Sequence, residues 1–261
     1  MSEAIAAAFA KCKEEGRVAF VPFITAGYPT LESTPDILLA MEAAGSDIIE
    51  VGMPFSDPLA DGGTIQAANT VALRAGVTMD KCLSFVEAAR ARGLKVPVIL
   101  MTYYNPILRF GEERLVARCK ECGVHGFIVV DLPPEEGSGL LDACKASGLA
   151  LVPLVAPTTT PARLDAIAKN AGGYVYCVSV TGVTGARAEL PADLAEFVAR
   201  VKAAIPLPAV VGFGLSTRAH VASVGAVAEG AVMGSAIVRA AAAGGADAVS
   251  ALIKEVTGRS D

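Results

Sequence analysis

The feature that most constrains the fold is a repeated alternation of short apolar runs with longer segments of helical period. The short runs are continuous in hydrophobicity, which is typical of parallel strands covered on both faces. Strands are predicted at residues 19–25, 47–51, 96–102, 126–131, 149–155, 174–179, 209–212 and 230–234. Helices are predicted at residues 33–44, 78–92, 112–122, 135–147, 161–170, 193–204, 217–224, 235–243 and 247–256.

This succession of strand and helix predicts an α/β protein with a single (βα)8 barrel, a TIM barrel, over residues 1–261. No linker-like stretch or shift in composition divides the chain, so we expect one domain. The residues ahead of the first strand predict an extra N-terminal amphipathic helix. A doubly wound open sheet is the structural alternative, but residues 25–29 lack the GxGxxG turn that usually opens it.

Composition excludes several classes of protein. The chain has a formal net charge of −5 with acidic and basic residues interspersed, so it carries no basic stripe for nucleic acid. No uninterrupted apolar run approaches the ~18 residues that span a membrane. Six cysteines in 261 residues indicate reduced thiols in a cytoplasmic compartment. The lone CxxC, Cys119 and Cys122, falls within a helical pattern and indicates helix thiols rather than a zinc site.

Two carboxylates stand at the exit of the second apolar run. Glu50 lies near its end, and Asp61 follows on the loop eleven residues later. A carboxylate at the exit of a buried strand is costly unless it is paired or used, and burial raises its pKa toward neutrality. One acid on a rigid strand and another on a movable loop predict acid–base chemistry on a carbon skeleton. The structural alternative for Asp61 is an ordinary turn residue.

Three glycine-bearing turns follow the last three predicted strands, at residues 181–185, 212–214 and 234–235. Glycine lets backbone N–H groups approach an anion closely, and the N-terminus of a following helix adds a favourable dipole. The last two loops of such a barrel are its usual phosphate site. The sequence therefore predicts a small phosphorylated metabolite, held by backbone donors without a lysine.

Side chains at the strand exits predict the wall of a ligand pocket. Phe23, Tyr103, Tyr176 and Phe213 take such positions, in keeping with an aromatic part of the substrate. Asp131 ends the fourth strand pattern ahead of two prolines, and it either caps the next helix or contacts the substrate.

The sequence lacks the residues that other catalytic mechanisms require. None of the nine lysines falls at the C-terminal end of a predicted strand, where a Schiff-base aldolase requires one. His125 precedes the fourth strand and His220 lies in a helical pattern, so a histidine-based metal site lacks ligands. We therefore expect carboxylate acid–base catalysis with no metal and no cofactor.

Five segments resemble the tryptophan synthase alpha subunit family. They are residues 23–29, 49–62, 129–136, 182–185 and 211–216. They occur in order along nearly the whole chain, and the second, IEVGMPFSDPLADG, is highly specific. The resemblance implies a retro-aldol cleavage of indole-3-glycerol phosphate to indole and glyceraldehyde 3-phosphate, a lyase reaction of tryptophan biosynthesis.

The resemblance also implies residue roles. Glu50 protonates indole C3 and takes the proton of the glycerol hydroxyl, while Asp61 takes or stabilises the indole N–H. The implied aromatic wall is Phe23, Tyr103 and Tyr176. The implied phosphate site is Gly185, Phe213, Gly214, Gly234 and Ser235, with Thr184 on the loop that closes over the substrate.

Members of this family usually dock on a pyridoxal-phosphate-dependent beta subunit in an alpha2beta2 complex and pass indole through an internal tunnel. The resemblance therefore implies that partner, with substrate channelling. Many members carry Arg where this chain has Val180, which leaves the loop-closure contacts of that Arg open here. The alternatives are a stand-alone lyase that releases free indole, a non-catalytic barrel and a phosphosugar isomerase. A native polypeptide with a fused beta domain, or one that has lost a plastid-targeting segment, also stays open.

Overall fold

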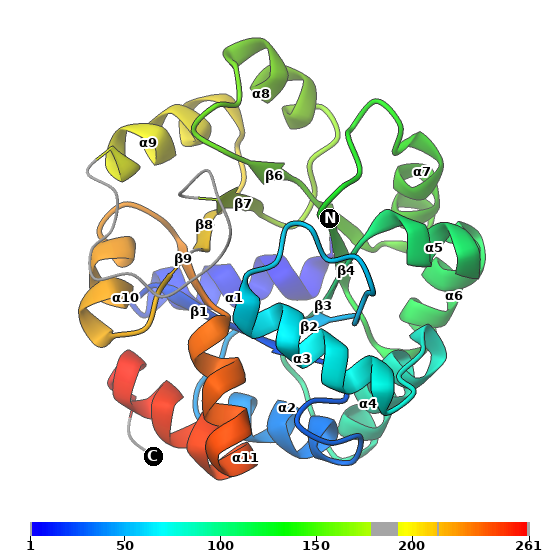
Figure 1. The fold of residues 1–261 in the computed structure, drawn as a ribbon. Helices are drawn as coiled ribbons and strands as arrows, with labels where there is room; N and C mark the ends of the chain where they lie inside the picture. Colours follow the sequence, from blue (N-terminus) through cyan, green and yellow to red (C-terminus); the bar gives the residue numbers. More distant parts are fainter. Residues whose placement is uncertain (1, 179–192, 213, 260–261) are drawn as a thin grey trace.

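Parallel strands line the centre of the molecule and helices surround them in this computed structural model, which describes residues 2–178, 193–212 and 214–259 (Figure 1). The strands of the described residues are β1 (Ala19–Thr25), β2 (Ile49–Gly52), β3 (Val98–Thr102), β4 (Gly126–Val129), β5 (Ala150–Val152), β6 (Leu154–Val155), β7 (Val175–Val178), β8 (Ala209–Gly212) and β9 (Gly230–Met233). Their order in the sheet is β5-β4-β3-β2-β1-β9-β8-β7-β6. The predicted barrel is confirmed.

The helices form the outer layer. They are α1 (Glu3–Glu14), α2 (Ser33–Ala43), α3 (Gly63–Arg74), α4 (Met79–Ala91), α5 (Tyr104–Phe110), α6 (Glu112–Cys122), α7 (Ser138–Ser147), α8 (Pro161–Ala168), α9 (Leu194–Ala204), α10 (Arg218–Gly225) and α11 (Ser235–Thr257). The sequence analysis missed α3 and α5. Gly62 and Gly63 stand at the start of α3, and Pro106 falls in the first turn of α5. Both segments therefore resemble loops in sequence.

The expected strand over residues 149–155 is divided in the structure. Pro153 separates β5 from β6, because proline has no N–H to donate to the ladder. The expected strand over residues 126–131 ends at Val129, and the helix expected from residue 135 begins at Ser138. These corrections all fall on the same side of the barrel.

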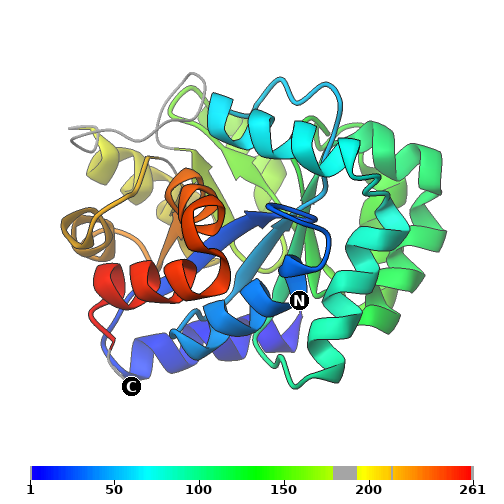
Figure 2. The same ribbon diagram turned by 60° about the horizontal axis from the view of Figure 1, so that its bottom comes forward.

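Strand residues alternate between two cores. Side chains such as Val21, Ile99 and Ile128 fill the barrel interior, whereas their neighbours pack outward against the helices. The predicted N-terminal helix, α1, lies across the N-terminal end of the barrel, where Ile5 and Phe9 join the interior cluster (Figure 2). The interior is therefore closed at this end.

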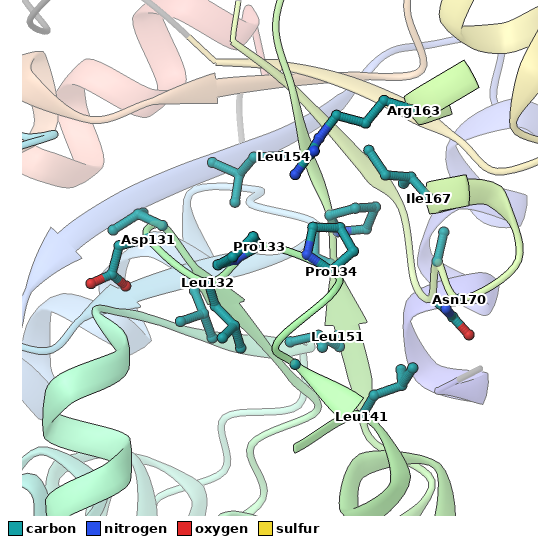
Figure 3. A pocket seen from close by; sticks show the side chains of 16 residues that line it. Asp131, Leu132, Pro133, Pro134, Leu141, Leu151, Leu154, Arg163, Ile167 and Asn170 are labelled. Carbon is teal, nitrogen blue, oxygen red and sulfur yellow. The ribbon is translucent and has the colours of Figure 1, made fainter. Parts of the chain in front are cut away.

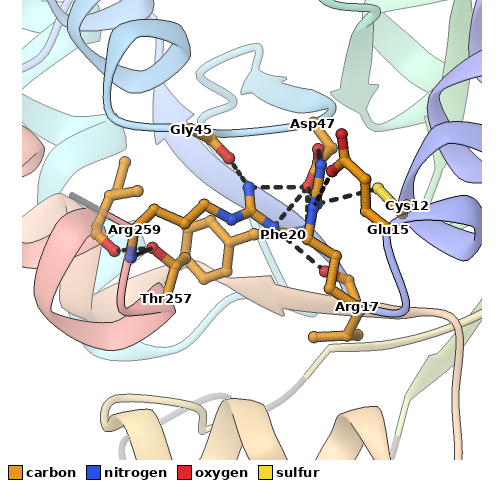
Figure 4. Close-up of polar contacts among 10 residues, drawn as sticks. Cys12, Glu15, Arg17, Phe20, Gly45, Asp47, Thr257 and Arg259 are labelled. Carbon is orange, nitrogen blue, oxygen red and sulfur yellow. Dashed lines mark hydrogen bonds and ion pairs between the residues drawn. The ribbon is translucent and has the colours of Figure 1, made fainter. Parts of the chain in front are cut away.

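A carboxylate at the start of β2 ties the chain ends together at the closed end (Figure 4). Asp47 accepts two hydrogen bonds of 2.8 Å from Arg17 and one of 2.8 Å from the backbone N–H of Phe20. It also accepts bonds of 3.1 Å from Arg259, which in turn donates to the carbonyl of Gly45. Burial opposes ionisation of Asp47, but these donors lower its pKa overall.

In the described part of the chain, α11 alone is long and apolar enough, by length and composition, to cross a membrane. Its backbone is not continuous, because Gly244 and Gly245 leave helical dihedral angles and produce a kink. Ile237, Val249 and Ile253 are fully buried, and α11 packs against α2, β1, α3 and α10. We therefore interpret α11 as a core element of the barrel, in agreement with the two helices predicted there.

Candidate active site

A cavity of about 380 Å³ opens at the C-terminal ends of the strands. Its lining includes eight residues that the sequence analysis singled out: Phe23, Glu50, Asp61, Tyr176, Gly212, Gly214, Gly234 and Ser235. They come from β1, β2, the loop after β2, β7, β8 and the turns after β8 and β9. The structure thus brings residues spread over most of the chain to one chamber.

Glu50 lies on the inner face of β2 and is completely buried. The Tyr174 hydroxyl donates a 2.8 Å hydrogen bond to its Oε1, while its Oε2 has no hydrogen-bond partner among the residues that the structure describes. Burial raises the pKa of Glu50 to about 8, although the bond from Tyr174 acts in the opposite direction. The carboxyl group therefore holds its proton at neutral pH and has one oxygen free to face a ligand.

Asp61 stands on the loop ahead of α3 and is held from several sides. Asn69 donates a 3.1 Å hydrogen bond to its Oδ2, and the side chain of Gln66 donates to its backbone carbonyl at 2.8 Å. Burial raises the pKa of Asp61 to about 6, opposed by hydrogen bonds from Asn69 and Tyr103. At neutral pH Asp61 is therefore mostly ionised while Glu50 is mostly protonated.

Two aromatic rings lie in the cavity wall, each above a glycine. A Cβ on Gly52 would come within 2.4 Å of the Phe23 ring, and one on Gly212 would lie 2.0 Å from the Tyr176 hydroxyl. Each ring thus occupies space that only glycine leaves free. Gly212, which the sequence analysis included in a phosphate turn, has this steric role in the structure.

Tyr103 takes a different place from the other predicted wall residues. It lies behind the loop that carries Asp61, in a small recess beside Phe23, Asp61 and Asn69. Its hydroxyl accepts a 3.0 Å hydrogen bond from the N–H of Ala60, and its ring packs on Phe55 at 5.0 Å between centroids. Tyr103 therefore anchors the loop next to Asp61.

The structure describes only some residues of the predicted phosphate turns. Gly214, Gly234 and Ser235 line the cavity, and Ser235 is the first residue of α11, whose N-terminus is thus directed at the chamber. Unsatisfied N–H groups at a helix N-terminus favour an anion. Val180, Thr184, Gly185 and Phe213 lie outside the described residues.

Asp131 does not cap the helix that follows it, as one of the two interpretations held. Its Oδ1 instead accepts a 2.7 Å hydrogen bond from the N–H of Tyr104, the first residue of α5, which precedes it in the chain. Asp131 is also absent from the lining of the cavity that holds Glu50 and Asp61. Its role in the structure is to fix the start of α5 to the end of β4.

Sequence reasoning missed two residues that hold the acids, Tyr174 and Asn69. Tyr174 stands two positions before Tyr176, a strand spacing that places both on the inner face, so alternation was an available signal. Asn69 lies on α3, which was not predicted as a helix, and the sequence offered no comparable signal. Among the described residues, no group of three or more His, Cys, Asp and Glu side chains is arranged to hold a metal ion.

Comparison with known proteins places this geometry in context. Residues 9–259 match the family described as tryptophan synthase alpha chain. The tryptophan synthase alpha chain of Roseiflexus sp. RS-1 is 47% identical over 90% of each chain. The tryptophan synthase of Saccharomyces cerevisiae is 52% identical over 91% of this chain but only 34% of the yeast protein, so the present chain spans about a third of that relative. A structure of Mycobacterium tuberculosis tryptophan synthase superposes with a TM-score of 0.91 at 37% identity, covering 97% of this chain and 96% of that one.

Proposed function

Since the chain belongs to the tryptophan synthase alpha chain family, we propose that Glu50 and Asp61 are the acid–base pair of its lyase reaction. The reaction is the cleavage of indole-3-glycerol phosphate to indole and glyceraldehyde 3-phosphate in tryptophan biosynthesis. The single observation that carries the assignment is the pair of acids in one cavity, one with its pKa raised to about 8 and the other to about 6. The stand-alone lyase is the less favoured alternative.

Glu50 acts on the carbon skeleton. Its protonated carboxyl group gives a proton to C3 of the indole ring, which leaves the ring positively charged. The resulting carboxylate takes the proton of the adjacent glycerol hydroxyl as the C–C bond breaks, and the bond electrons restore the aromatic ring. Glu50 thus ends the cycle protonated, so no external acid or base is consumed.

Asp61 stabilises the charge that this protonation creates. Its ionised carboxylate accepts a hydrogen bond from the indole N–H or takes its proton. Either interaction makes C3 of the ring more basic. The bonds from Asn69 and Tyr103 hold the carboxylate at the cavity wall before the substrate arrives. Such preorganised electrostatic stabilisation acts at the position where charge develops.

The remaining predicted residues complete the proposal for substrate binding. Phe23 and Tyr176 hold the indole ring, with Tyr103 positioning the loop. The phosphate lies at the N-terminus of α11, held by Gly214, Gly234 and Ser235, and by Thr184, Gly185 and Phe213. The chain acts as a single cytoplasmic barrel domain, docked on a beta subunit in an alpha2beta2 assembly that channels indole.

Substitution of each acid tests the assignment. Glu50→Gln and Asp61→Asn are each expected to reduce indole formation by at least ~10²-fold, the usual contribution of a positioned acid or base. Glu113→Gln, on the exposed face of α6, is the matched control and should retain the activity of the parent chain. Circular dichroism and thermal unfolding should show that all variants fold. Cleavage by Glu50→Gln within tenfold of the parent rate would contradict the proposal.

A further inference from the structure

A second cavity, of about 500 Å³, lies on the flank of the barrel between α7 and α8 (Figure 3). It is larger than the catalytic cavity of about 380 Å³. The two helices leave it room because α7 packs mainly against α6, and α8 mainly against α9. Its inner wall is apolar and includes Val129, Leu141, Leu151 and Ile167.

The barrel wall has a break in its hydrogen-bond ladder where this flank cavity meets the catalytic cavity. The ladder between β4 and β5 ends at the pair Ile128 and Val152, and among the described strands β6 pairs with β7 alone. Pro153 cannot continue the ladder because it has no N–H. Beyond this point no backbone hydrogen bonds join β4 to β6, so the two strands are free to separate.

Two residues at this seam belong to both cavities. Val130, just after β4, and Leu154, on β6, line the catalytic cavity and the flank cavity alike. Both side chains are apolar and partly exposed in the structure. A rearrangement of these two side chains is therefore enough to connect the chambers, and no backbone hydrogen bond of a ladder has to break.

The charged groups of the flank cavity stand at its rim, among them Asp131, which accepts the bond from the N–H of Tyr104. Arg163 donates bonds of 3.2 and 3.3 Å to Glu135, and Lys145 donates a 3.3 Å bond to Asn170. All four residues are exposed to solvent. The charged groups thus stand at the rim while the inner wall is apolar, and an apolar wall favours a neutral, apolar ligand.

We propose that the flank cavity is a second binding site for indole, reached from the catalytic cavity through the seam at Val130 and Leu154. This inference rests on the proposed function, because that reaction produces indole beside the seam. Indole is flat, neutral and mostly apolar, whereas the co-product and the substrate carry a phosphate that the apolar inner wall does not match. The flank cavity gives the product a place within this chain, apart from the reacting groups.

Equilibrium binding of added indole tests this site without turnover. Calorimetry on the purified chain should detect two sites, and Ala171→Phe, which fills the flank cavity, should weaken one of them at least tenfold. Ala166→Phe, on the exposed face of α8 outside the cavity, is the matched control and should keep both. One site in all three proteins, or two unaffected sites in Ala171→Phe, would overturn the proposal.

A diffraction measurement keeps the test decisive if Ala171→Phe does not fold. Crystals of the parent chain soaked with 5-bromoindole should show an anomalous bromine peak between α7 and α8. A peak at the barrel mouth alone would overturn the flank site. Because neither measurement requires cleavage, a chain that binds indole on its flank but fails to cleave the substrate would count against the proposed function only.

Discussion

Glu50 and Asp61 differ in what surrounds each carboxyl group, and this difference separates their pKa values. Glu50 is fully buried with a single donor, Tyr174, so loss of solvation dominates and its pKa rises to about 8. Asp61 keeps a small exposure and has donors on two sides, so its pKa rises only to about 6. Paired acids whose environments separate their pKa values are typical of acid–base sites.

The pKa values predict a bell-shaped pH profile for kcat/KM. Below about pH 6 Asp61 becomes protonated and can no longer accept the indole N–H, and above about pH 8 Glu50 loses the proton that it must donate. Activity should therefore fall on both sides of an optimum between these limits. Initial rates of indole release by the isolated chain from pH 5 to pH 10 would reveal the two limbs.

Tyr174→Phe should move only the alkaline limb of that profile. The Tyr174 hydrogen bond favours the ionised form of Glu50, so its removal should shift this limb to higher pH. Tyr104→Phe, which loses a hydroxyl bound to Glu112 instead, is the control and should leave both limbs in place. An alkaline limb that moves downward in Tyr174→Phe would refute this account of Glu50.

Sequence reasoning at the residue scale found acids but not what holds them. A buried carboxylate at a strand exit is unusual enough to be recognised from the chain alone, as Glu50 was. Its donor, Tyr174, stands 124 positions later, and only the closure of the barrel makes them neighbours. The local sequence therefore shows that a charge will be buried. It does not show which hydrogen-bond donor stabilises that charge, because the tertiary fold decides this.

At the scale of elements, the chain's periodicity predicted most strands and helices. It did not predict the structure of segments that are polar or contain proline. The strand interrupted at Pro153 and the helices α3 and α5 are the main differences. The break at Pro153 follows from its missing N–H, whereas α3 is decided by packing, since it buries Ile65, Ala68 and Asn69. Propensity is a weak guide where tertiary contacts dominate.

The carboxylate of Asp47 joins the start of β2 to α1, β1 and the segment after α11, and its loss should destabilise the whole barrel. We expect Asp47→Asn to lower the free energy of unfolding by about 3 kcal/mol at pH 7, because it breaks a mostly buried ion pair and leaves Arg17 and Arg259 without their shared partner. Urea unfolding followed by circular dichroism measures this difference. Asp165→Asn, on the exposed face of α8, is the control.

The effect of Asp47→Asn should depend on pH in one direction. The pKa of Asp47 is lowered in the folded state, so its stabilisation is complete above the unfolded-state value of about 3.9 and is lost as the pH falls further. The difference between the parent chain and Asp47→Asn should therefore shrink below about pH 4. A difference that stays constant down to pH 2.5 would show that Asp47 acts through packing alone.

On the scale of the whole molecule, the two ends of the barrel have separate tasks. The N-terminal end is closed by α1 and fastened by the Asp47 cluster, whereas the C-terminal end holds the acids and the anion-directed helix N-terminus. Leu59, on the loop that carries Asp61, and Leu108, on α5, follow strand C-termini and are 79% and 60% exposed. Since the tryptophan synthase alpha chain family implies a beta-subunit partner, we expect that partner to cover this end of the barrel.

Leu108→Asp tests whether this end receives the beta subunit. A carboxylate at a buried apolar contact must lose its hydration, so the affinity for a purified beta subunit should fall at least tenfold, about 1.4 kcal/mol. Ala10→Asp, on the exposed face of α1 at the closed end, is the matched control and should bind with the parent affinity. Isolated Leu108→Asp should release indole at the rate of the isolated parent chain, because Leu108 is not part of the catalytic cavity. Equal loss of affinity in both variants would point to charge or misfolding rather than position, and unchanged affinity in Leu108→Asp would place the beta subunit elsewhere on the barrel.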